Sequence, residues 1–142
     1  MALKIAIGLL IASLVLLVIY GADVAVASSS QYREGFLPFS EAIRGGAFGG
    51  GAVVMSIIAF VISRKEYAPL VSALLFVNGG LIIAGMVSII AQGALAAENS
   101  AGAMRTIGST VILGCILIGL GAWKFVTDRR ILATKRKEPV RK

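Results

Sequence analysis

Four long runs of uncharged residues divide this chain and limit what it can fold into. The runs lie between successive charged residues and cover 5–22, 45–63, 67–97 and 106–123. A helix needs roughly 17 to 25 apolar residues to cross a bilayer, and each run is long enough. Only 15% of the residues are charged, whereas soluble domains average about 25%. The sequence therefore predicts an all-α membrane protein with four transmembrane helices, and it excludes a soluble domain.

Short connections join the expected spans, so consecutive helices should be antiparallel neighbours in an up-down-up-down bundle. Ser40 is placed to cap the second span, and Asn99 or Ser100 to cap the fourth. Pro69 suits the first turn of the third span, because its nitrogen would have no helical partner there. One transmembrane domain, 1–134, would precede a basic tail, 135–142, and would contain spans at about 4–27, 42–63, 69–92 and 101–127.

The positions of lysine and arginine indicate which side of the membrane each connection faces. If both termini share one side, that side holds eleven of the 14 cations, and the other side holds Arg33, Arg44 and Arg105. Lysine and arginine accumulate on the cytoplasmic side of membrane proteins. We therefore expect a multi-pass protein of the cell membrane with both termini in the cytoplasm. The basic tail is a candidate for contact with anionic lipid headgroups, and we expect no nucleic-acid partner.

The first run has two interpretations, a retained transmembrane helix or a cleaved signal peptide. Ala25-Val26-Ala27 before Ser28 has the small residues of a signal-peptidase site. The run is longer than the apolar core of a typical signal peptide, which favours a retained helix. Charge alone leaves both interpretations open, because removal of the first helix would not change the bias of the remaining connections.

Glycines along the second, third and fourth spans predict faces where helices pack closely. The second span opens with Gly45-Gly46-Ala47-Phe48-Gly49-Gly50-Gly51, which contains Gly-xxx-Gly twice. Such spacing lets another backbone approach, either within the bundle or from another subunit. We assign helix packing or subunit contact to seven glycines: Gly45, Gly46, Gly49, Gly50, Gly80, Gly114 and Gly121.

A few polar side chains stand out against the apolar spans. Asn78 lies inside the third span, where an unpaired amide would cost several kcal/mol. We expect it either to bond a neighbouring helix or to line a path for an ion or solute. Asp23 ends the first span and Arg44 begins the second, and we expect them to pair at the interface. Trp123 and Lys124 should anchor the fourth helix at the membrane surface.

The chain lacks the residue types of familiar membrane chemistry. It has no histidine and a single cysteine, Cys115, so this chain alone cannot build a histidine metal site, a bis-histidine haem site or an iron–sulfur site. We expect no catalytic, cofactor-binding or metal-binding residues. In size and span number it resembles the small multidrug transporters, but their acidic residue in the middle of the first helix is absent. Asn78 and the glycine-rich segments resemble the fluoride channels, whose Thr- and Phe-rich motif has no counterpart here.

Three functions are compatible with this pattern. The favoured one is a non-catalytic accessory or structural subunit of a larger membrane complex, for example a membrane oxidoreductase or respiratory assembly whose cofactors belong to other chains. Its partners would be the lipid bilayer and other membrane subunits or further copies of itself. The alternative is an oligomeric channel or small-solute transporter in which Asn78 lines the path. A membrane enzyme is least favoured, because its chemistry would depend on polar groups in the short connections.

Overall fold

The computed structural model describes residues 2–29, 36–39, 43, 45–91 and 100–137. Within these ranges the chain is almost entirely helical and contains no strand, which confirms the predicted all-α class. A π-helical segment, η1 (Gly45–Gly50), leads directly into α3. The α-helices of the described residues are α1 (Ala2–Ser29), α3 (Gly51–Ser63), α4 (Pro69–Ala91) and α5 (Ser100–Lys137).

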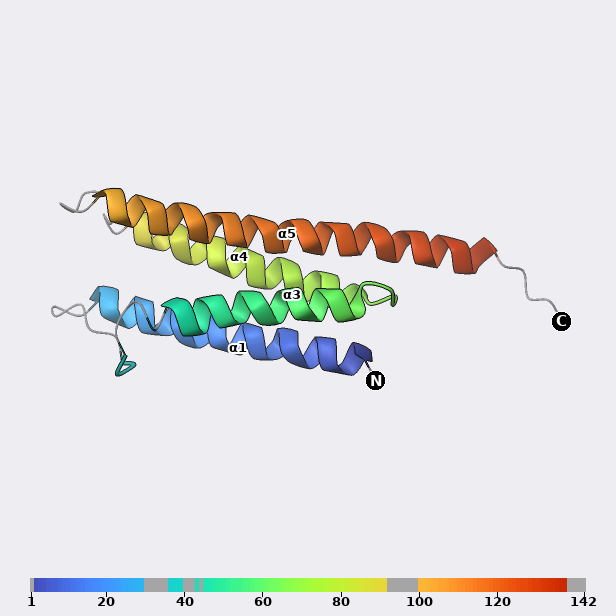
Figure 1. Cartoon of the computed structure of the whole chain (residues 1–142), viewed down its shortest axis with the longest axis horizontal. Helices are drawn as coiled ribbons and strands as arrows, with labels where there is room; N and C mark the ends of the chain where they lie inside the picture. The colour runs from blue at the N-terminus through green and yellow to red at the C-terminus, as the bar shows by residue number, and fades with distance from the viewer. Residues whose placement is uncertain (1, 30–35, 40–42, 44, 92–99, 138–142) are drawn as a thin grey trace.

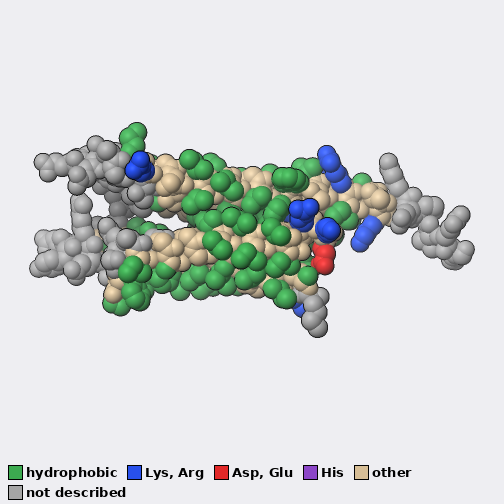
Figure 2. Space-filling view, viewed as in Figure 1, with side chains coloured by type: hydrophobic (Ala, Val, Ile, Leu, Met, Phe, Trp, Pro, Cys, Tyr) green, Lys and Arg blue, Asp and Glu red, His purple; other side chains and the backbone are tan. Residues whose placement is uncertain are grey.

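Four helical stretches of the described residues are long and apolar enough to cross a membrane. They are Ala2–Ala27, Gly46–Ser63, Pro69–Ser88 and Ile107–Arg136. In the most apolar 18-residue window of each stretch, between 22% and 39% of the residues are buried inside the protein, so the larger share of every window is at least partly exposed. Apolar side chains cover the middle of the molecule, and most of the lysine and arginine side chains gather near one end (Figure 2). Such a surface is typical of a multi-pass membrane protein, whose apolar sides face lipid.

The helices form two closely packed pairs, α1 with α3 and α4 with α5 (Figure 1). The α1 helix also packs on α4 and joins the two pairs. Consecutive helices run in opposite directions, so the start of α1 and the α3–α4 turn lie at the same end of the molecule. The fully buried side chains of Leu10, Leu75 and Leu117 contribute to the core from α1, α4 and α5.

The α5 helix is longer than the expected fourth span. It continues past Thr127 to Lys137, and its last turns extend beyond the other helices (Figure 1). Residues 128–137 contain neither glycine nor proline and include several strong helix formers, so nothing in this segment ends the helix. The helix therefore includes the first residues of the expected basic tail.

The second span begins differently from the expectation of a regular helix. Gly45–Gly50 is π-helical, a wider turn that the conformational freedom of its four glycines accommodates. Ser40, Arg44 and Asn99, for which capping or pairing roles were expected, lie outside the described residues. Ser100 is the first residue of α5.

Candidate functional site

Three helices meet at a buried polar cluster formed by Asn78 of α4, Ser13 of α1 and Ser56 of α3. All three side chains are completely buried. The amide nitrogen of Asn78 donates to the hydroxyl oxygens of Ser13 at 3.0 Å and of Ser56 at 3.2 Å. The two hydroxyl oxygens lie 2.9 Å apart, and Ser13 also donates to the backbone carbonyl of Ala52 at 2.8 Å. Asn78 thus makes hydrogen bonds to two neighbouring helices.

The energy of this Asn78 cluster comes from several modest hydrogen bonds. Bonds between membrane helices contribute on average about 0.6 kcal/mol each, and at most about 1.7 kcal/mol. The amide nitrogen of Asn78 has two hydrogens, one for each serine, while its Oδ1 atom has no hydrogen-bond partner among the described residues. The sequence pattern predicted a role for Asn78 but not for the two serines. Each serine stands alone within an apolar stretch, and this isolation is the signal that could have connected them to Asn78.

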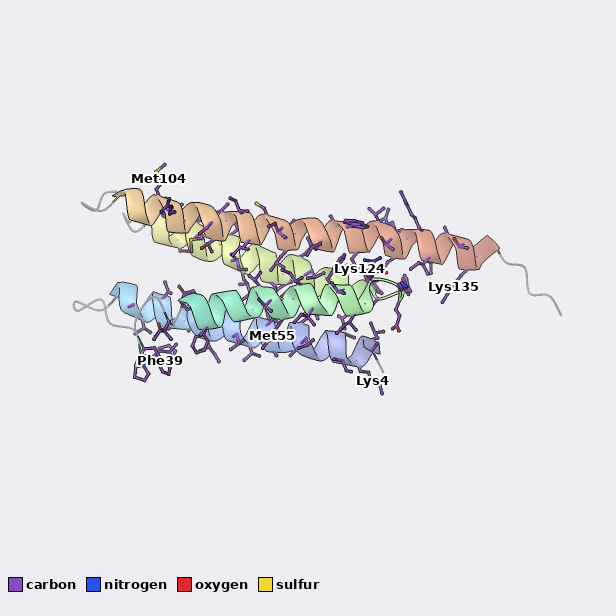
Figure 3. The ribbon with its side chains drawn as sticks, viewed as in Figure 1. Lys4, Phe39, Met55, Met104, Lys124 and Lys135 are labelled. Atoms are coloured by element: carbon purple, nitrogen blue, oxygen red, sulfur yellow. The ribbon has the colours of Figure 1, made fainter. Side chains whose placement is uncertain are left out.

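A second polar cluster lies where the chain turns from α3 into α4. Lys124 and Asp128 are one turn apart on α5, are both buried, and form an ion pair with 2.5 Å between Nζ and Oδ1. The Lys124 ammonium also donates to the backbone carbonyl of Glu66 in the turn. Figure 3 shows Lys124 between α5 and this turn. Lys124 therefore does not anchor the helix at the lipid surface as expected, whereas its neighbour Trp123 is exposed.

The Lys124–Asp128 pair faces the ends of two other helices. Asp128 accepts hydrogen bonds from the backbone N–H of Ala68 and the hydroxyl of Ser72, each at 3.3 Å, at the start of α4. The Lys124 ammonium meets the carbonyl of Glu66, just beyond the end of α3. A helix carries partial positive charge at its N-terminus and partial negative charge at its C-terminus. The Asp128 carboxylate therefore meets the helix end of opposite sign at the start of α4, while Lys124 holds α5 to the turn that follows α3.

Asp23 is buried near the end of α1, although the sequence analysis placed it at the interface. Asp23 is 1% exposed, and its Oδ1 atom accepts a hydrogen bond from the backbone N–H of Leu37 at 2.8 Å. This bond holds the backbone at Leu37 against the end of α1. The expected partner, Arg44, lies outside the described residues. The position of Asp23 gives it a structural role in closing this connection.

Close packing of helix backbones occurs between α4 and α5 at Gly79, Gly114 and Gly121. A Cβ atom added at Gly79 would lie 2.8 Å from Cγ1 of Ile118 and 2.9 Å from the carbonyl oxygen of Gly114. Cβ atoms added at Gly114 and Gly121 would come within 2.9 Å and 3.3 Å of α4 side chains. Of the third-span glycines, the sequence analysis selected Gly80, but a Cβ there would meet nothing within 4 Å. Gly79 makes the close approach instead.

The glycine-rich start of the second span is not packed in this way. Cβ atoms added at Gly46, Gly49 or Gly50 would meet no atom within 4 Å. The surroundings of Gly45 lie outside what the structure describes. We refer to Gly46, Gly49 and Gly50 as the glycine strip. The α1 helix packs alongside η1, and Gly49 and Gly50 are half-buried, but each position of the glycine strip leaves open space for a Cβ atom.

The polar contacts described above are hydrogen bonds and one ion pair. Within them, no group of three or more His, Cys, Asp or Glu side chains could hold a metal ion. Cys115 is a free, exposed thiol on α5. The length and apolar composition of the four helices indicate a helical multi-pass membrane protein. Comparisons with protein-family models, curated proteins and solved structures found no match to this chain.

Proposed function

We propose that this protein is a non-catalytic structural subunit of a larger membrane complex. The observation that carries this proposal is the difference between its two sets of glycines. Gly79, Gly114 and Gly121 pack closely within the chain, whereas the glycine strip has no such neighbour among the described residues. Membrane helices associate largely through van der Waals packing, which small residues increase by allowing backbones to approach. The glycine strip is therefore suited to receive a transmembrane helix of another subunit.

The proposed arrangement in the cell membrane is a four-span, up-down-up-down bundle with both termini in the cytoplasm. The excess of lysine and arginine on one side supports this orientation. We propose that α1 is retained rather than cleaved, since it supplies Ser13 to the Asn78 cluster and Asp23 to the contact with Leu37.

The buried polar groups support a role in maintaining the bundle itself. Both amide hydrogens of Asn78 have acceptors in Ser13 and Ser56, and Lys124 pairs with Asp128. These contacts favour the structural role over the alternative of a channel, in which Asn78 would have to turn toward a path. The partner subunits in the proposed complex would carry whatever cofactors its chemistry needs.

The proposal predicts that bulky side chains on the glycine strip will separate the protein from its partner. We expect Gly46→Leu/Gly50→Leu to reduce the partner recovered with the tagged protein from native membranes about tenfold, because overpacking costs about 1 to 3 kcal/mol. The partner is identified by mass spectrometry after extraction in mild detergent. The matched control is Gly8→Leu/Gly119→Leu, which places leucines where an added Cβ also meets nothing within 4 Å.

Two results would contradict the proposal. Recovery of the unaltered protein alone, or only as a homo-oligomer, would remove the accessory-subunit role. Equal loss of partner in the two double variants would show that the glycine strip has no special part in assembly. Equal helicity of the purified proteins would exclude a folding defect as the cause of any difference.

A further inference from the structure

Four exposed cations from two segments far apart in the sequence lie near the buried Lys124–Asp128 pair. The α3–α4 turn supplies two of them, and the part of α5 directly after Asp128 supplies the other two. Hydrogen bonds from Lys124 to the carbonyl of Glu66, and from the N–H of Ala68 to Asp128, hold this turn against α5. We name these cations the basic collar; its members are Arg64, Lys65, Arg129 and Arg130.

The basic collar carries a net positive charge. Lys124 and Asp128 neutralise each other in the interior. Among the described residues of this end, Glu66 is the exposed acid. Figure 2 shows several blue side chains and one red group at the end of the molecule where α3 turns into α4. The collar therefore presents a surface that complements a cluster of anions.

The position of the collar along α5 places it at the depth of lipid headgroups. Trp123 is 68% exposed and marks the membrane interface, where tryptophan is enriched. Arg129 follows six residues later, roughly 9 Å further along the helix axis. Side chains on a helix lean toward its N-terminus, which for α5 is the membrane side. Consistent with this, the Arg129 guanidinium lies 4.5 Å from the centre of the Phe125 ring, one turn back.

We propose that the basic collar binds the headgroup phosphates of anionic phospholipids. The headgroup layer is roughly 5 to 7 Å thick on each side of the bilayer, within reach of Arg129 and Arg130. Lys135 and Arg136 are also exposed on α5, but they lie roughly 18 to 20 Å beyond Trp123 along the axis. Figure 3 shows Lys135 well beyond Lys124 on the same helix. The lipid contact thus belongs to the collar and not to the basic tail.

The single tryptophan of the chain, Trp123, provides a local probe of this contact. The full-length protein is reconstituted in phosphatidylcholine vesicles that contain either brominated phosphatidylglycerol or brominated phosphatidylcholine, with bromine near the headgroup end of the acyl chain. Quenching of Trp123 fluorescence gives the relative association of the two lipids with the protein. We expect at least a several-fold preference for phosphatidylglycerol, since a single cation near an anionic surface already adds about fivefold to binding.

Two pairs of variants on the same helix test the position of the site. Arg129→Gln/Arg130→Gln removes two of the four cations and should lower the preference at least about fivefold, and Arg129→Lys/Arg130→Lys should retain it. Lys135→Gln/Arg136→Gln removes the same charge from the same helix and should leave the preference unchanged. Equal quenching by the two lipids in the unaltered protein, or equal losses in the two glutamine pairs, would overturn the proposal. Because the purified protein is used alone, this result does not depend on whether a partner subunit exists.

Discussion

Replacing Asp128 with alanine is expected to lower the free energy of unfolding by about 3 to 5 kcal/mol. The change leaves the buried ammonium of Lys124 without its counter-charge and removes the acceptor for Ala68 and Ser72. Breaking a buried ion pair from one side costs this much because the remaining charge stays desolvated and unpaired. The α3–α4 turn would lose its attachment to α5 at the same time.

Reversible denaturation of the purified protein in detergent measures this loss of stability. Two further variants test whether the broken ion pair is its cause. Arg130→Ala removes an exposed charge two residues away and should change the free energy of unfolding by less than about 0.5 kcal/mol. Lys124→Met/Asp128→Leu removes both charges and should recover most of the stability, since apolar residues often replace a buried pair without loss. If Asp128→Ala and Arg130→Ala had equal effects, the pair would not hold the helices as described.

Gly79→Ala is expected to destabilise the protein by about 3 kcal/mol, at the upper end of the usual cost of overpacking. The new methyl group would lie 2.8 Å from Ile118 Cγ1 and 2.9 Å from the backbone oxygen of Gly114, and a backbone atom cannot rotate away. The α4 and α5 helices would have to separate.

The adjacent glycine provides a matched control for this prediction. Gly80→Ala adds the same methyl group to the same helix, where it meets nothing within 4 Å. Alanine favours a helix over glycine by up to about 1 kcal/mol, so this variant should be neutral or more stable. Both variants are measured by the same denaturation in detergent. Similar losses of stability at the two positions would show that α4 and α5 do not meet at Gly79.

The helical class was predictable because charge spacing marks membrane spans directly. The expected spans at 4–27 and 69–92 agree closely with α1 and α4, whose bounds are Ala2–Ser29 and Pro69–Ala91. The length of α5 was not predictable in the same way. The last part of α5 lies beyond the apolar run and is rich in charged residues. An apolar pattern does not indicate where such a charged helix ends in water.

The contacts between helices were harder to predict than the helices themselves. The side chains of α1 and α4 are apolar on every face of the helix, so the sequence pattern does not show which face points inward. This is why Asn78 was selected while its partners Ser13 and Ser56 were not, and why Gly80 was chosen in place of Gly79.

The burial of Lys124 shows a signal that the sequence analysis did not use. Lysine at the end of a span usually extends to the membrane surface, which led to the expectation of an anchor. Asp128, four residues later, is on the same face of the helix and can pair with it. A lysine that has such a partner can remain inside the protein.

In the proposed arrangement the chain crosses the membrane four times, with both ends in the cytoplasm. Its single cysteine makes the claim directly testable, because Cys115→Ser gives a cysteine-free chain to which one cysteine can be returned at a chosen position. In intact cells treated with a membrane-impermeant maleimide, Phe36→Cys should be labelled, whereas Lys65→Cys and Lys135→Cys should react only after the membrane is opened. Labelling of Lys135→Cys from outside intact cells would contradict the proposed arrangement.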